Sequence, residues 1–144
     1  MGKSKIVIRL ATHKDRIGIK EVNEKSLPVG YDEHEWGLMI AQKRSFVISI
    51  SMLIVGYLVG NKDGCIISFA VLEKYRGAGL GKKLLLMYLN EMRLLGYKKV
   101  ILRVKTSNDI AHKLYDSVGF KTISVLDNYY GENIHGYLMQ FDFS

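Results

Sequence analysis

Some residue types that define common protein classes are scarce in this sequence. Its 144 residues include one cysteine, one proline and one tryptophan. The single cysteine, Cys65, excludes an internal disulfide, and no Cys/His spacing resembles a zinc site. No stretch approaches the roughly 20 apolar residues of a membrane span, and Met1–Lys5 leads into a short strand rather than a signal peptide. We therefore expect a soluble, cytoplasmic protein with no metal site and no membrane association.

Positive charge is in excess, but it is not concentrated. Lys and Arg number 21 against 14 Asp and Glu, which gives a formal net charge of +7. Such an excess suits an acidic partner, for example a phosphorylated cofactor. The lysines are scattered, and the sequence has neither a recognition helix nor alternating aromatic and basic residues, so we expect no specific nucleic-acid partner. The length predicts a single domain over residues 1–144.

Hydrophobic periodicity and turn residues predict an α+β protein. A capping pattern at Thr12 and Asp15 opens the first helix, whose buried side we expect to carry Ile17, Ile19 and Val22. The expected order is strand 6–10, this helix, a turn within 24–31, helix 32–43, an antiparallel meander over 45–72, helix 79–95, strand 99–104, helix 108–118, strand 120–126, a polar loop over 127–133 and strand 136–143. This order predicts a mixed sheet with helices on its faces.

A glycine-rich segment joins the end of the meander to the helix at 79–95. Glycines allow the backbone to come close to a ligand, and a helix N-terminus favours negative charge, so the segment 76–82 predicts a pyrophosphate site. Two other phosphate-binding motifs do not fit. A dinucleotide fingerprint would need glycine in place of Lys82, and a P-loop would need glycine in place of Arg76 and Ser or Thr in place of Lys83.

The pattern Arg76-x-x-Gly79-x-Gly81 resembles the coenzyme A loop of GNAT acetyltransferases, and the resemblance extends from Ile8-Arg9 to Gly119-Phe120. It implies a GNAT fold, with a mixed, mostly antiparallel sheet, helices on both faces and a splayed central strand pair, and acetyl-CoA as co-substrate. It further implies that Tyr115 is catalytic and assists departure of the thiolate. The coenzyme A-binding residues that it implies are Phe69, Val71, Arg76, Gly77, Ala78, Gly79, Leu80, Gly81, Lys82, Asn108 and Tyr115.

Two further segments resemble the acceptor groove of protein N-terminal acetyltransferases. Leu27-Pro28-Val29-Gly30-Tyr31 is similar to one wall of that groove, and Asn128-Tyr129-Tyr130 is similar to the opposite wall. The acceptor-binding residues that this implies are Leu27, Pro28, Tyr31, Tyr129 and Tyr130. The implied acceptor is the α-amino group of a protein or peptide N-terminus, with an uncharged first residue such as Met expected to be preferred. An acidic first residue held by Arg103 or a nearby lysine stays open, and so does recruitment by a ribosome or an auxiliary subunit.

The catalytic base of the resembling enzymes is missing here. Their usual base positions hold Val29, Cys65 and Arg103, and arginine stays protonated at neutral pH. The remaining candidates flank the groove: His135, His34, Glu33 and Glu35. Cys65 is expected to be a small buried side chain rather than a nucleophile. A small amine, a polyamine or an internal lysine as acceptor remains an alternative, as does a non-catalytic acyl-CoA-binding module.

Overall fold

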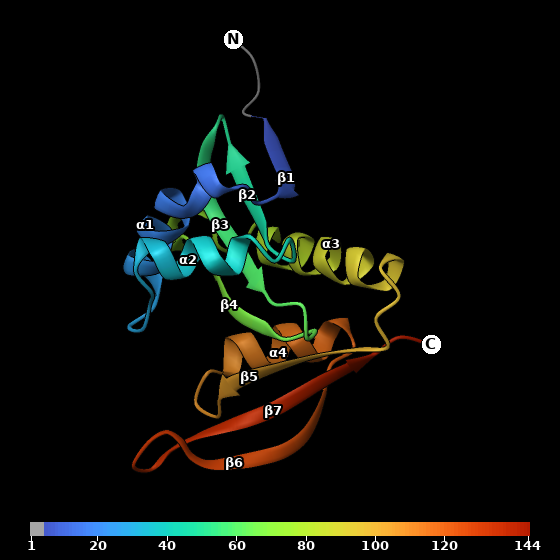
Figure 1. Ribbon diagram of the computed structural model, residues 1–144. Coiled ribbons are helices and arrows are strands. Elements are labelled where there is room, and N and C mark those ends of the chain that lie inside the picture. The colour runs from blue at the N-terminus through green and yellow to red at the C-terminus, as the bar shows by residue number, and fades with distance from the viewer. Residues whose placement is uncertain (1–4) are drawn as a thin grey trace.

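The structure, a computed structural model, describes residues 5–144 (Figure 1). Four antiparallel strands form one sheet in the order β1-β2-β3-β4, and three antiparallel strands form a second in the order β5-β7-β6. Along the chain the elements are β1 (Ile6–Leu10), α1 (Arg16–Ser26), α2 (Glu33–Ile40), β2 (Phe46–Ile50), β3 (Leu53–Gly60), β4 (Ile66–Val71), α3 (Leu80–Leu94), β5 (Lys99–Lys105), α4 (Asp109–Val118), β6 (Lys121–Gly131) and β7 (Ile134–Asp142), with short 3-10 turns at His13–Asp15 and Glu73–Tyr75. The α+β prediction is confirmed.

Two apolar clusters lie on opposite faces of the sheets. One packs α3 and α4 against strands of both sheets, and Leu85, Leu89 and Met92 of α3 are buried in it, as their spacing predicted. The other lies beneath α1 and α2 and contains the fully buried Trp36. Removing such a ring would cost about 3–5 kcal/mol. None of the helices within residues 5–144 is long and apolar enough to cross a membrane.

An ion pair ties β1 to the start of α1. Both carboxylate oxygens of the buried Asp15 accept from the Arg9 guanidinium, at 2.7 and 2.8 Å, and one also accepts from the Thr12 backbone N–H at 2.7 Å. Burial alone would raise the pKa of Asp15, but these hydrogen bonds outweigh it and hold the pKa below its usual value. The prediction for Ile17 is wrong, because it lies roughly 200° around the helix from Ile19 and is 48% exposed.

Two predicted boundaries are also wrong. The second helix ends at Ile40 rather than near residue 43, because the chain turns there and Lys43 takes a positive φ of 60°. The polar loop predicted over 127–133 is largely strand, since β6 continues to Gly131. A bulge at Asn128 (φ 56°) allows this: its side chain accepts from the Asn133 N–H at 2.8 Å, and its own N–H donates to His135 Nδ1 at 2.9 Å.

The two sheets meet at β4 and β5, which run parallel and then separate. A single bridge, Cys65 with Ile101, joins them, and Ile101 N–H donates to the Gly64 carbonyl at 2.9 Å. Beyond this bridge the two strands have no recorded ladder pairing, and Figure 1 shows them diverging toward the left of the view. The splayed strand pair is therefore present, and we call the space between the diverging strands the opening.

Candidate active site

The glycine loop at the start of α3 presents free backbone donors. Gly77 and Gly79 have φ values of +86° and +76°, and a Cβ added at either would meet nothing within 4 Å. The first hydrogen bond of the helix runs from Lys83 N–H to the Gly79 carbonyl at 3.1 Å, so the N–H groups before it have no acceptor within the helix. A backbone that is open to approach, with unpaired donors at a helix N-terminus, fits a pyrophosphate.

Arg76 fastens this loop to the end of β4. Its Nε donates to the Val71 carbonyl at 2.8 Å. Leu72 N–H donates to Val55 of β3, so by strand alternation the backbone groups of Val71 and Phe69 point away from β3 and into the opening. Strand backbone that faces away from its neighbour is what the pantetheine of coenzyme A would need. Phe69 and Val71 are the positions named from the sequence, and of their groups the Val71 carbonyl is already bonded to Arg76.

Tyr115 reaches from α4 to the opening. Its ring lies 6.2 Å from Phe69 of β4 and 5.7 Å from Phe120, measured between ring centroids, and only 8% of the residue is exposed. Burial, with a smaller contribution from Tyr130, raises the pKa of Tyr115 far above its usual value, so the hydroxyl stays protonated at neutral pH. Asn108, the other residue named for this end, caps α4 by accepting from Ala111 N–H at 3.1 Å.

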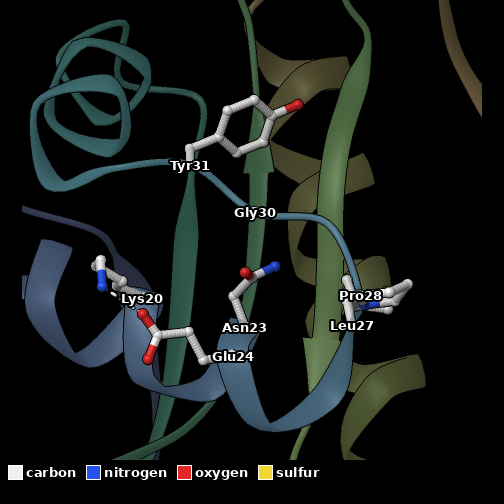
Figure 2. A pocket seen from close by; sticks show the side chains of 7 residues that line it. All are labelled: Lys20, Asn23, Glu24, Leu27, Pro28, Gly30 and Tyr31. Carbon is white, nitrogen blue, oxygen red and sulfur yellow. Dashed lines mark hydrogen bonds and ion pairs between the residues drawn. The ribbon is translucent and has the colours of Figure 1, made fainter.

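The α1–α2 loop forms one side of a cavity of about 350 Å³ (Figure 2). It brings together three residues that were predicted to bind the acceptor: Leu27, Pro28 and Tyr31. The Tyr31 ring packs edge-on against the buried Trp36, at 5.1 Å between centroids, which fixes the end of the loop. Glu24, also in the lining, is paired with Lys20 in the same helix.

A buried hydrogen-bond network, which the sequence analysis did not predict, holds this loop in place. Asn23, 2% exposed, donates through Nδ2 to the Val29 carbonyl at 3.1 Å and to the Tyr57 hydroxyl at 2.9 Å. The Tyr57 hydroxyl lies 2.7 Å from Ser68 Oγ on β4. Gly30 packs directly against this network. A Cβ at residue 30 would lie 2.1 Å from Asn23 Oδ1, so a larger side chain there would displace Asn23. The only sequence signal was a polar residue at each of two otherwise apolar positions, Asn23 and Ser68.

Tyr129 and Tyr130 pack on each other at the far end of β6, with ring centroids 4.9 Å apart. A cation from β5 lies over each ring at 5.7 Å: the Arg103 guanidinium over Tyr129 and the Lys105 ammonium over Tyr130. Burial raises the pKa of Tyr130 above its usual value. In Figure 1 the α1–α2 loop is drawn above, and the β6–β7 hairpin below, the diverging ends of β4 and β5. The loop is connected to β4 through Tyr57 and Ser68, and the tyrosine pair lies against the two cations of β5.

The positions that carry a base in the resembling enzymes hold groups that cannot act as one here. Cys65 is buried, which raises the pKa of its thiol, and Arg103 donates to its Sγ at 3.7 Å. Glu35 accepts from Asp32 N–H at 3.1 Å as part of the α2 cap, and His135 Nδ1 accepts from the bulge N–H described above. Glu33 lies 3.9 Å from Arg16, and His34 is exposed. No group of three potential metal ligands occurs within the described part of the chain.

Residues 11–120 match the family described as "Acetyltransferase (GNAT) family". The N-alpha-acetyltransferase of Sulfurisphaera tokodaii is 31% identical, over 92% of this chain and 90% of the relative. The crystal structure of Ard1 from Thermoplasma volcanium aligns with a TM-score of 0.89 and 28% identity, covering 96% of this chain and 98% of that one. Arabidopsis thaliana Naa50 in complex with the bisubstrate analogue CoA-Ac-MVNAL aligns with a TM-score of 0.83 and 25% identity, over 96% and 99%.

Proposed function

The chain belongs to the GNAT family of acetyltransferases, with acetyl-CoA as its co-substrate, and we propose that its acceptor is the α-amino group of a protein or peptide N-terminus. The observation that carries the proposal is the pair of walls beside the opening, a loop fixed by Asn23 on one side and a tyrosine pair on the other. The N-alpha-acetyltransferase relative and the peptide-bearing Naa50 complex support it.

The glycine loop holds the cofactor in this proposal. Backbone N–H groups at the start of α3 bind the pyrophosphate, and the side chains of Arg76 and Lys82 add positive charge at the same end. The backbone of Phe69 and Val71 binds the pantetheine within the opening. When bound, acetyl-CoA supplies the thioester carbonyl that the acceptor amine attacks.

Tyr115 acts as a hydrogen-bond donor in this scheme. A thiol titrates near 8.5, whereas the pKa of Tyr115 lies far above the usual tyrosine value of about 10. Full proton transfer from this phenol to a thiolate is therefore unfavourable, and a hydrogen bond that stabilises the developing negative charge is the stronger role. The transfer is direct and needs no enzyme nucleophile, which agrees with the burial of Cys65.

The groove favours a peptide over a polyamine. A polyamine site needs unpaired carboxylates, but Glu24 in the loop cavity is neutralised by Lys20, and the facing wall carries Arg103 and Lys105. Tyrosine hydroxyls at an exposed edge are instead suited to bind peptide backbone.

The test is to compare kcat/KM for short peptides with free N-termini, a matched peptide with a blocked N-terminus and an internal lysine, and spermidine. We expect efficient acetylation of free N-termini. Faster acetylation of the blocked peptide or of spermidine would overturn the proposed acceptor. Binding of acetyl-CoA without turnover of any amine would favour the non-catalytic alternative.

A further inference from the structure

Among the residues that the structure describes, two cations on the acceptor side of the opening have no carboxylate partner. Val100, Leu102 and Val104 of β5 are buried in the cluster beneath α3 and α4. Arg103 and Lys105 alternate with them, so their side chains leave the opposite face of the sheet. That is also the face on which α1 and α2 cover Tyr57, next to the chain that fixes the groove loop.

Both cations follow the point where β4 and β5 separate. The last bridge between these strands is at Ile101, and Arg103 and Lys105 lie two and four residues beyond it. They therefore line the β5 side of the opening, at the end where the acceptor must meet the thioester.

The surroundings leave both groups available to an anion. No carboxylate within residues 5–144 lies within the 4 Å of an ion pair to Arg103 or Lys105. Each cation lies over a tyrosine ring, and within the described part of the chain the Arg103 guanidinium donates one hydrogen bond, the weak one to Cys65 Sγ. A guanidinium placed over a ring at this distance still has N–H groups that can bind a carboxylate.

We propose that Arg103 and Lys105 form a basic wall of the acceptor groove that binds an acidic side chain within the first two residues of the peptide. This rests on the proposed function and narrows its substrate class. Asp or Glu at one of these positions places a carboxylate beside the tyrosine pair, while the backbone of the same residues faces the hydroxyl groups. Leu27 and Val29 on the facing wall accommodate an apolar first residue. In a peptide beginning Met-Asp or Met-Glu, the Met side chain would therefore contact this apolar wall and the carboxylate would contact the basic wall.

The experiment compares peptides that differ only in Asp against Asn at position 1, 2 or 3, assayed with the wild type, Arg103→Gln, Lys105→Gln and the double variant. Lys99→Gln is the matched control, because it removes the same charge from the same strand and face but at the far end of β5. We expect Asp to exceed Asn in kcat/KM by roughly fivefold at position 1 or 2 for the wild type and the control. The ratio should fall to near one in the double variant and in about 0.5 M salt, because exposed ion pairs are screened.

Three outcomes would overturn the inference: equal rates for Asp and Asn in the wild type, a preference that persists in the double variant, or a preference that does not respond to salt. Arg103→Glu is the decisive complement, since it should reverse the preference toward Lys at the same position. If Arg103→Glu acted only by misplacing Tyr129, the variant would acetylate the Asp, Asn and Lys peptides equally slowly, and the preference would not reverse toward Lys. Failure of every free N-terminus to react would instead refute the proposed function, so the two ideas fail separately.

Discussion

Replacing Gly79 by alanine separates the role of the loop in cofactor binding from its role in folding. Gly79 caps α3 with a φ of +76°, a conformation that costs a side chain-bearing residue about 1–2 kcal/mol. An added Cβ meets no protein atom within 4 Å, so strain is the only penalty in the free protein. In the complex, the same methyl group would occupy the space through which the pyrophosphate approaches the backbone.

Gly96 provides a matched control at the other end of the same helix. It has a φ of +89°, and a Cβ there also meets nothing within 4 Å. Gly79→Ala and Gly96→Ala should therefore lower Tm by similar amounts, roughly 3–8 °C. Only Gly79→Ala should lose acetyl-CoA affinity, by at least about tenfold or 1.4 kcal/mol. Gly79→Glu should abolish binding, because its carboxylate would repel the phosphates.

Thermal unfolding and isothermal calorimetry with acetyl-CoA measure the two effects independently. Equal acetyl-CoA affinity of Gly79→Ala and Gly96→Ala, with both variants equally folded, would contradict the proposed role of Gly79. Such a result would mean that the pyrophosphate lies elsewhere, and the assignment of Arg76 and Lys82 would fall with it.

Three further changes probe the acceptor side and the fold. Tyr115→Phe should lower kcat by about tenfold or more with little change in acetyl-CoA affinity, and an unchanged kcat in steady-state assays would leave the residue a packing role only. Gly30→Ala forces a Cβ onto Asn23, so it should raise the KM for peptide and lower the free energy of unfolding in denaturant by roughly 1–3 kcal/mol. Gly37→Ala is the control and should do neither, because its Cβ makes an ordinary 3.5 Å contact. Because the pKa of Asp15 is lowered by folding, its stabilisation is present above about pH 4 and is lost as pH falls through the folded value; Asp15→Asn should flatten the acid limb of the stability profile, and an unaltered limb would contradict this.

The elements that sequence could predict are those with a strong local signal. The helix at 80–94 repeats leucines at helical spacing between two glycines of positive φ, and the hairpin at 61–64 carries turn residues. Prediction failed where a local pattern had a non-local explanation. The polar segment 127–133 looks like a loop in sequence, but its polar groups satisfy a bulge inside a continuing ladder.

The site divides in the same way. The predicted cofactor loop is a contiguous stretch of backbone, so glycine spacing alone is enough to propose it. The acceptor side depends on pairs far apart in sequence: Asn23 and Tyr57 are separated by 34 residues, and Cys65 and Arg103 by 38. Hydrophobic periodicity cannot predict contacts between residues so far apart in sequence. The packing of α1 on β3 and the contact between β4 and β5 bring these residues together.

The missing base can be understood from the acceptor that we propose. An α-amino group titrates near 8, so about a tenth of it is neutral at pH 7, whereas a lysine side chain titrating near 10.4 is neutral in only about one molecule in 2,500. A site with Arg103 where relatives place a base cannot remove the lysine proton efficiently, and its positive charge makes a neutral amine more favourable than an ammonium ion. Without a strong base, the chain would therefore discriminate against internal lysines by roughly 200-fold through amine pKa alone. The substitution of Arg103 and Cys65 for the usual bases is thus compatible with acetylation of N-termini, and it is a poor arrangement for acetylation of lysine.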